Sequence, residues 1–135
     1  MDRIDRVSIV GMGAMGILYG DFFANALGRE QVTFLADSDR ARRYRNTPVY
    51  CNGRKMDFRI QDGAVPDSQG PAQLLLFAVK ATALGDAISV AGNQVGKDTV
   101  ILSVLNGITS EAVIGEALGM DHVLYCCLLY TSPSP

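Results

Sequence analysis

Near the N-terminus, three glycines spaced G-x-G-x-x-G follow directly on a short apolar run. The run is Val7–Val10, and the glycines are Gly11, Gly13 and Gly16. Apolar side chains at helical spacing come next, which predicts that an amphipathic helix follows the glycines. The apolar face expected for this helix consists of Met15, Leu18, Tyr19, Phe22 and Ala26. Glycines placed between a strand and a helix are typical of the βαβ unit that opens a dinucleotide-binding domain.

The three glycines have different expected roles in such a loop. Gly11 allows the tight turn out of the strand, Gly13 lets the backbone approach a pyrophosphate, and Gly16 permits the helix to pack closely on the sheet. The helix N-terminus then presents unpaired N–H groups to the phosphates. A loop whose glycines serve only a tight turn is the alternative. The predicted cofactor-binding residues of this loop are Gly11, Met12, Gly13, Ala14, Met15 and Gly16.

Strand-like and helix-like segments alternate along the rest of the chain. Strands are expected over 31–36, 73–79 and 99–105, helices over 40–45, 82–91 and 110–118, and a hairpin over 49–60 around Asn52-Gly53. This alternation predicts an α/β fold, a doubly wound, Rossmann-like parallel sheet with a small β-hairpin excursion beside it. The ligand crevice of such a sheet lies beyond the carboxyl ends of its strands. The residues expected at those ends are Gly11, Asp37, Lys80 and Asn106.

Length and composition limit the class of protein. The chain has 135 residues, enough for one domain with its own core, and its net charge of −2 gives no electrostatic case for binding nucleic acid or an anionic membrane. No segment has the roughly 20 apolar residues of a membrane span or the apolar core of a signal peptide, so a cytoplasmic protein is expected. The three cysteines are too few and too poorly spaced for a zinc site, and no metal is expected. His122, the single histidine, is expected to be a turn residue rather than a catalytic acid.

Charges of opposite sign meet after the second predicted strand. Asp37 comes about 20 residues after Gly16, where an acidic residue binds the ribose 2′-OH of NAD in domains of this kind. Arg40, Arg42 and Arg43 follow closely, and an arginine at this place can hold the 2′-phosphate of NADP. A solvated helix face would contain the same arginines. The residues alone therefore leave the choice between NADP and NAD open.

The order of three motifs resembles that of the ketopantoate reductase family, also called 2-dehydropantoate 2-reductases. They are the glycine loop, the run 74–81 that includes Val79-Lys80-Ala81, and Leu105-Asn106-Gly107-Ile108. The resemblance covers about residues 6–125 and implies a dinucleotide-binding domain that is followed, in the family, by a helical domain. It implies NADP-dependent reduction of a 2-oxo acid, 2-dehydropantoate to pantoate in pantothenate biosynthesis, and leaves room for a homodimer at full length.

The resemblance also implies roles at the reacting end of the site. Lys80 and Asn106 would lie beside the nicotinamide and contact both cofactor and substrate, the lysine through its charge and the amide by orienting hydroxyl groups. Their alternatives are a surface lysine and a turn asparagine. The family's general acid, a lysine, belongs to the helical domain, which is absent from this sequence, so the 135 residues alone are expected to be inactive. The expected boundaries are 1–126 for the cofactor domain and 127–135 for a tail outside the family pattern, whose prolines and serines do not suit the family's helix.

Two other functions stay open. One is the cofactor domain of another two-domain hydroxy-acid dehydrogenase, although the motifs of such enzymes near Lys80 and Asn106 are absent. The other is a non-catalytic module that senses NAD(P), which would need no group at the hydride-transfer end. A glycine-rich methyltransferase is disfavoured because no acidic residue stands just ahead of Gly11.

Overall fold

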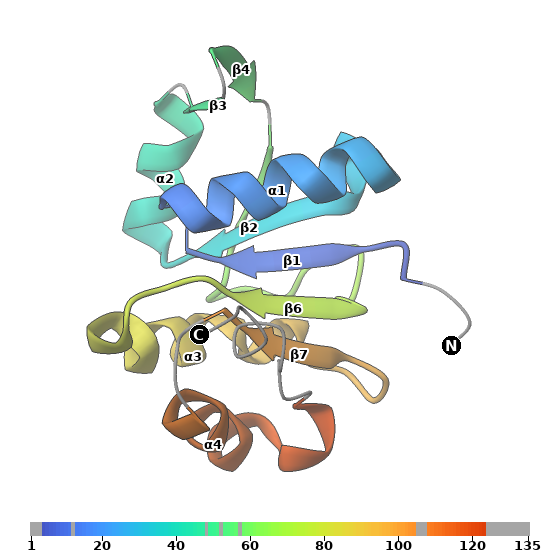
Figure 1. Ribbon diagram of the computed structural model, residues 1–135, viewed down its shortest axis with the longest axis vertical. Helices are drawn as coiled ribbons and strands as arrows, with labels where there is room; N and C mark the ends of the chain where they lie inside the picture. Colours follow the sequence, from blue (N-terminus) through green and yellow to red (C-terminus); the bar gives the residue numbers. More distant parts are fainter. Residues whose placement is uncertain are drawn as a thin grey trace, which may run out of the picture.

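A five-stranded parallel sheet forms the centre of the molecule (Figure 1). The computed structural model describes residues 4–11, 13–47, 49–51, 53–56, 58–104 and 108–123. The strand order is β5-β2-β1-β6-β7, and each neighbouring pair is parallel. The strands are β1 (Val7–Val10), β2 (Val32–Ala36), β5 (Arg59–Asp62), β6 (Leu74–Phe77) and β7 (Val100–Ser103). The predicted α/β class with a doubly wound parallel sheet is confirmed.

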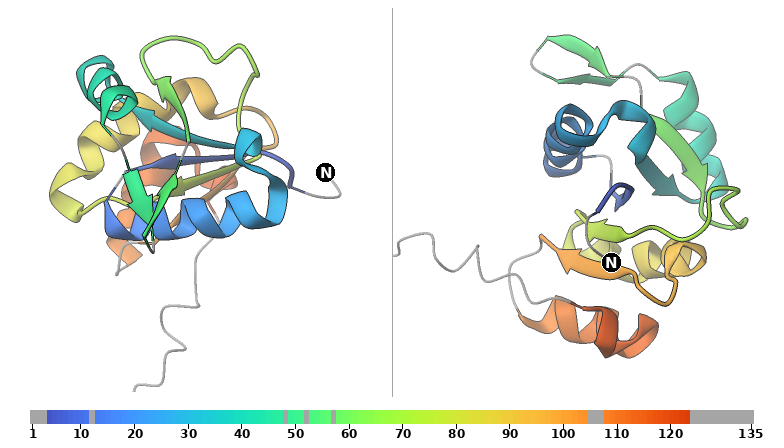
Figure 2. Two further views of the ribbon diagram at one scale, coloured as in Figure 1. Left: turned by 90° about the horizontal axis from the view of Figure 1, so that it is seen from above. Right: turned by 90° about the vertical axis from the view of Figure 1, so that its right-hand side faces the viewer.

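Helices cover both faces of this sheet. They are α1 (Ala14–Leu27), α2 (Ser38–Asn46), α3 (Leu84–Ala91) and α4 (Ile108–Leu118), with the 3-10 turns η1 (Arg29–Gln31), η2 (Ala81–Ala83), η3 (Gly92–Gln94) and η4 (Met120–His122). The right-hand view of Figure 2 shows α1 on one face and α3 and α4 on the other. Helix α2 packs beside β2 and β5 at the edge. No helix among the described residues is long and apolar enough to cross a membrane.

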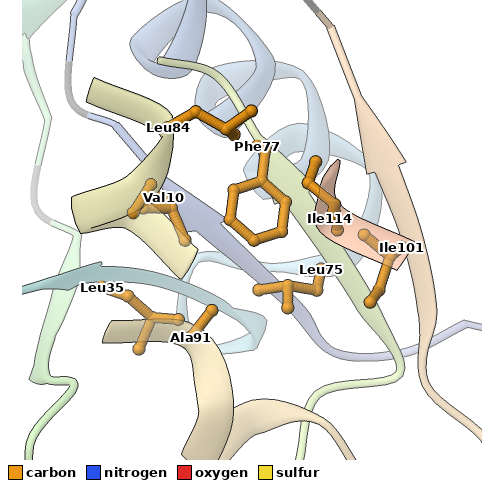
Figure 3. Close-up of a cluster of buried hydrophobic side chains, with 9 residues drawn as sticks. Val10, Leu35, Leu75, Phe77, Leu84, Ala91, Ile101 and Ile114 are labelled. Atoms are coloured by element: carbon orange, nitrogen blue, oxygen red, sulfur yellow. The ribbon is translucent and has the colours of Figure 1, made fainter. Parts of the chain in front are cut away.

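Two apolar cores lie on the two faces of the sheet. Figure 3 shows the core beneath α3 and α4, where Phe77 of β6 lies among side chains from the strands and both helices. All four residues of β6 are buried, as expected for a continuous apolar run in a parallel strand covered on both faces. The other core contains Ile9 and Phe34 and is closed by α1. These cores fix the strand ends at which the predicted site residues lie.

The face that helix α1 presents to the sheet overlaps only in part with the one its apolar pattern predicts, since Tyr19 packs against the core. Met15, Leu18 and Phe22 were expected to be covered but are 45%, 53% and 63% exposed. The buried side carries small residues at a spacing of four, namely Gly16, Gly20 and Ala24. A Cβ at Gly20 would lie 2.8 Å from the Phe34 ring, so the helix approaches the sheet too closely for larger side chains. These small residues form the centre of the contact, and Tyr19, Phe23 and Leu27 pack against the same core beside them.

The predicted hairpin is present but shorter than expected. Strands β3 (Val49–Cys51) and β4 (Arg54–Met56) form a separate antiparallel pair, and Gly53 between them has φ +79°. Asn52 lies outside the described residues. The segment Arg59–Asp62, of which the first part was assigned to the hairpin, instead forms β5 and pairs with β2. Phe58 packs against Phe34 with ring centroids 4.7 Å apart, which draws this segment to the main sheet.

A buried ion pair lies at the amino ends of the strands, opposite the glycine loop. It joins Arg59 at the start of β5 to Asp67 in the loop between β5 and β6. The Asp67 carboxylate accepts from Arg59 Nη2 at 2.7 Å and Nη1 at 2.9 Å, and from Gln94 Nε2 at 2.8 Å. Gln94 Oε1 in turn accepts from Ser8 Oγ at 3.0 Å. The side chain of Asp67 is only 4% exposed, against 26% for that of Arg59. The hydrogen bonds from Arg59 hold the pKa of Asp67 well below its usual value, with smaller contributions from the Gln69 N–H and Gln94.

Candidate functional site

The glycine loop follows β1 and is closed on two sides by backbone. Gly11 has φ +109°, and a Cβ there would lie 2.3 Å from the carbonyl oxygen of Ala78, just beyond β6. A Cβ at Gly16 would lie 1.8 Å from the carbonyl oxygen of Gly11. Both positions therefore admit only glycine, the first for the turn out of the strand and the second for the entry of α1. The role of Gly11 is the one predicted from the motif, whereas Gly16 was predicted to allow packing on the sheet and instead allows the close approach of the Gly11 carbonyl.

Gly13 differs from the other two glycines of the loop. It is exposed, its φ of −85° suits any residue, and a Cβ there would meet nothing within 4 Å. It is also the N-cap of α1, and no side chain caps the first turn. A group with negative charge could approach the helix N-terminus through this open space. The uncapped backbone N–H groups of the first turn of α1 and the open space at Gly13 thus fit a pyrophosphate.

The remaining predicted residues of the loop are less well defined. Met12 lies outside the described residues. Ala14 begins α1, and Met15 extends into solvent from its first turn. Their assignment to a cofactor site stays a prediction that rests on the motif.

A pocket beside the loop brings together three predicted site residues. Gly11, Asp37 and Arg40 line it, between the ends of β1 and β2 and the first turn of α2. The opposite wall comes from the segment after β6 and from α3. Its residues are Val79, Ala83, Asp86, Ala87 and Val90. The buried residues that line it are apolar, whereas Asp37, Arg40 and Asp86 are exposed, and an apolar lining with a few polar groups is typical of a small-molecule site.

Asp37 is held in place as the N-cap of α2. Its Oδ1 accepts a hydrogen bond from the backbone N–H of Arg40 at 2.8 Å. Its Oδ2 lies 3.7 Å from Nε of Arg40, and both side chains are about half exposed, at 51% and 49%. Asp37 is therefore fixed by the start of the helix, and the Arg40 guanidinium lies alongside it.

A second carboxylate lies at the end of the neighbouring strand. Asp62 closes β5, accepts from Ser38 Oγ at 2.6 Å and accepts from the Ala64 N–H at 2.9 Å. These two hydrogen bonds, the one from Ser38 first, lower the pKa of Asp62 below its usual value, and Arg45 and Arg42 contribute smaller charge effects.

Sequence reasoning missed Asp62 and also Asp86. The signal for Asp62 was an acidic residue at the end of a strand, which is recognisable only once residues 59–62 are assigned to the main sheet. Asp86 carried no separate signal, because an acidic residue in the first turn of a helix is ordinary.

Lys80 also lies beyond the carboxyl ends of the strands, after β6, but it does not line this pocket. The segment that leads to it is anchored by the Ala78 N–H, which donates to the Val10 carbonyl at 2.8 Å. The carbonyl of Lys80 accepts from the Ala83 N–H at 2.9 Å, while its side chain is exposed. Within the part of the chain that the structure describes, no side chain forms an ion pair or hydrogen bond with the Lys80 ammonium. Its charge is available to a ligand.

Two further predicted residues have different outcomes. Asn106 lies outside the described residues, and Val104, the last described residue before it, donates to the Phe77 carbonyl at 3.0 Å. The role of Asn106 stays a prediction. His122 lies in the turn η4, with its Nδ1 2.8 Å from the Thr99 carbonyl at the amino end of β7. It is a turn residue, as predicted, and lies at the opposite end of the sheet from the glycine loop.

Comparison with known proteins agrees with this geometry. The family described as ketopantoate reductase PanE/ApbA matches residues 7–133, which includes most of the segment 127–135 predicted to be a tail. The boundary at residue 126 stays a prediction.

Solved structures with the same fold include two 2-dehydropantoate 2-reductases and a D-mandelate dehydrogenase. The putative reductase from Enterococcus faecalis has a TM-score of 0.69, 21% identity, and coverage of 89% of this chain and 40% of its own. For the reductase from Geobacter metallireducens GS-15 the values are 0.67, 24%, 89% and 40%. For D-mandelate dehydrogenase with NADH and anilino(oxo)acetate they are 0.71, 21%, 89% and 39%. The chain thus spans well under half the length of these proteins.

Proposed function

Because the chain belongs to the ketopantoate reductase PanE/ApbA family, a family of NAD(P)-dependent oxidoreductases, we propose that it binds a nicotinamide dinucleotide for the reduction of a 2-oxo acid. The observation that carries this proposal is the contrast within the glycine loop. Gly11 and Gly16 are closed by backbone, whereas Gly13 is open at the N-terminus of α1. A tight turn alone would not require a vacant side-chain position at that point.

Each part of the site then has a task. The glycine loop and the first turn of α1 hold the pyrophosphate, and the pocket lined by Asp37 and Arg40 holds the adenosine. When bound, the cofactor supplies the hydride. Lys80 carries the positive charge that holds the carboxylate of a 2-oxo acid near the reacting end. Asn106 is proposed to orient the same substrate, as the resemblance implies.

The substrate proposed is 2-dehydropantoate, which is reduced to pantoate. The support for it is family membership together with Lys80, an exposed cation beyond β6 that no described residue pairs with. The resemblance implies NADPH as the cofactor, and the local charges that bear on this choice are considered separately below. We also propose that the full-length enzyme forms a homodimer.

The main alternative to this proposal is that the chain is the cofactor domain of another hydroxy-acid dehydrogenase. The D-mandelate dehydrogenase shares this fold at the same 21% identity as the Enterococcus faecalis protein, so the fold does not separate the two substrates. A non-catalytic sensor of NAD(P) is disfavoured, because it would need no free cation beyond β6. Comparing the binding of 2-dehydropantoate with that of an aromatic 2-oxo acid by the cofactor-loaded chain separates the two reductases.

The binding proposal is tested by titrating NADH and NADPH into the 135-residue chain. We expect at least one of them to raise the melting temperature, since a ligand of the folded state stabilises it. Gly13→Val fills the open space and should remove this rise without unfolding the protein. Gly92→Val is the matched control, because Gly92 is equally open but lies after α3, away from the loop. A folded chain that neither cofactor stabilises would refute the proposal.

We further propose that these 135 residues alone do not turn over 2-dehydropantoate. Hydride addition to a ketone generates an alkoxide, and the absence of a general acid lowers the rate by about 10²–10⁴-fold. The resemblance assigns that acid to a lysine of the helical domain. Turnover by the chain at the rate of an intact reductase would show that a proton donor lies within these residues, with Lys80 the first to examine.

A further inference from the structure

We propose that this site is built for NADH rather than NADPH, because Asp37 fixes a carboxylate beside the ribose position that carries the extra phosphate of NADPH. The inference rests on the proposed function, since it concerns the same cofactor pocket. In dinucleotide-binding domains an acidic residue after the second strand bonds the ribose 2′-OH. The inference departs from the NADP preference that the family resemblance implies.

The carboxylate of Asp37 cannot easily leave this position. Its Oδ1 caps α2 through the backbone N–H of Arg40, so turning the side chain away would uncap the helix. For the second oxygen, Oδ2, the contact found among the described residues is an ion pair with Nε of Arg40 at 3.7 Å. A ribose hydroxyl can donate to such an oxygen, whereas a phosphate has no proton to donate at neutral pH and is repelled by it.

Three of the four arginines of α2 have acceptors within this chain. Nη1 of Arg42 lies 3.6 Å from Asp39 Oδ1, and Nη2 of Arg45 donates to the Ile60 carbonyl at 3.1 Å. Arg40 is the arginine of α2 that lines the pocket, and its charge is opposed there by Asp37. Exposed ion pairs of this kind are weak, and Arg40 could turn toward a ligand. Asp37 would still remain, because a backbone N–H rather than the guanidinium fixes it.

The residue after Asp37 is also unsuited to a phosphate. Ser38 donates its hydroxyl proton to Asp62 at 2.6 Å, so it is not free to donate to a ligand. The partner is a carboxylate and thus an anion at neutral pH, and the hydrogen bonds from Ser38 and the Ala64 N–H lower its pKa further. The end of β5 thus adds a second negative charge next to the start of α2.

The far wall of the pocket adds a third carboxylate. Asp86 of α3 lines the pocket opposite Asp37, and its side chain forms no ion pair with any residue that the structure describes. The charged residues lining the pocket are therefore two aspartates and one arginine. This balance disfavours the two additional negative charges of a 2′-phosphate and leaves hydroxyl and amino groups as suitable partners.

The test compares Asp37→Asn with Asp39→Asn. Asparagine caps helices as well as aspartate does, so Asp37→Asn removes the charge and keeps α2 capped. Asp39→Asn removes a charge from the same helix at an exposed position that does not line the pocket. Dissociation constants for NADH and NADPH are measured by calorimetric titration of the 135-residue chain and both variants at one fixed salt concentration, with melting temperatures to confirm folding.

We expect the unaltered chain to bind NADH about tenfold or more tightly than NADPH, and Asp37→Asn to reduce this ratio by about tenfold. Asp39→Asn should leave the ratio unchanged. Tighter binding of NADPH by the unaltered chain, or an equal effect of both substitutions, would overturn the inference while leaving the proposed function standing. Failure of a folded chain to bind either cofactor would refute the proposed function and this inference with it.

Discussion

The two parts of the candidate site differ in how their charges are used. After β2, the charges of Asp37 and Arg40 are matched to each other, and the carboxylate is fixed by the start of α2. After β6, Lys80 is exposed, and no described residue pairs with it. The fixed carboxylate of Asp37 can discriminate between ligands but cannot move toward one. The exposed side chain of Lys80 can change its conformation to reach a ligand. We therefore propose that the first part selects the cofactor and that the second captures the substrate.

The largest expected effect comes from the loop that both parts share. Gly16→Val should unfold the chain or lower its free energy of unfolding by more than about 3 kcal/mol, because its side chain would overlap the Gly11 carbonyl and overpacking by smaller amounts already costs up to about that much. Urea denaturation measures the change. Gly13→Val, only three residues away, should change the free energy of unfolding by less than about 1 kcal/mol, since its side chain meets open space. Equal loss of stability in the two variants would contradict the distinction between closed and open glycines.

A buried ion pair provides the next largest effect and a contrast to the exposed pair of the pocket. Asp67→Ala leaves Arg59 without its anionic partner and should lower the free energy of unfolding by about 3 kcal/mol, at the lower end for buried pairs because Arg59 keeps some contact with water. The affinity for NADH should not change, since this pair lies at the amino end of the sheet. A variant with reduced affinity and unchanged stability would reverse our division of roles.

The same pair predicts how stability depends on pH. The pKa of Asp67 is lower in the folded chain than its usual value of 3.8, so the folded state holds its proton less tightly than the unfolded state does. The stabilisation is complete above the unfolded pKa and is lost as the pH falls below about 4. Denaturation between pH 6 and pH 2.5 should show a steeper acid loss for the unaltered chain than for Asp67→Ala. Parallel curves would show that another group governs acid unfolding.

The smallest effect on stability is expected at the unpaired cation. Lys80→Ala should change the free energy of unfolding by less than about 0.5 kcal/mol, as is usual for an exposed residue. It should weaken binding of a 2-oxo acid to the NADH-loaded chain by about 1.5–3 kcal/mol, the range for a hydrogen bond to a charged group. Lys97→Ala is the control, because Lys97 is exposed in the loop before β7, at the other end of the sheet. If both variants bind the acid equally well, Lys80 has no role in its capture.

Patterns that depend on neighbouring residues predicted much of this fold. The continuous apolar run of β6 and the strand-glycine-helix order of the loop are local, and both are found in the structure. The covered face of α1 was predicted only in part: Tyr19 packs against the core, but Met15, Leu18 and Phe22 are exposed. Close approach to Phe34 places Gly20 at the centre of the contact instead. The hydrophobicity pattern of a helix does not indicate how closely the helix approaches the sheet.

The charge arrangement of the site depends on contacts between distant residues. Ser38 and Asp62 lie 24 positions apart and meet only because β5 pairs with β2. Asp86 reaches the pocket because α3 packs on the side of the sheet opposite α1. The sequence indicated that Asp37 and Arg40 would both be near the cofactor. It could not indicate that Asp37 would be fixed by the helix start, which is a property of the folded backbone.

The central claim, that the glycine loop binds a nicotinamide dinucleotide, is tested most directly by following backbone amide resonances of the chain during a titration with NADH. We predict that the amides of Gly11, Gly13 and Ala14 shift with a common dissociation constant, together with that of Asp37. The amides of Gly96 and Thr99, at the opposite end of the sheet, should stay in place. Saturable shifts confined to that opposite end, or no shifts at millimolar NADH in a folded chain, would contradict the account.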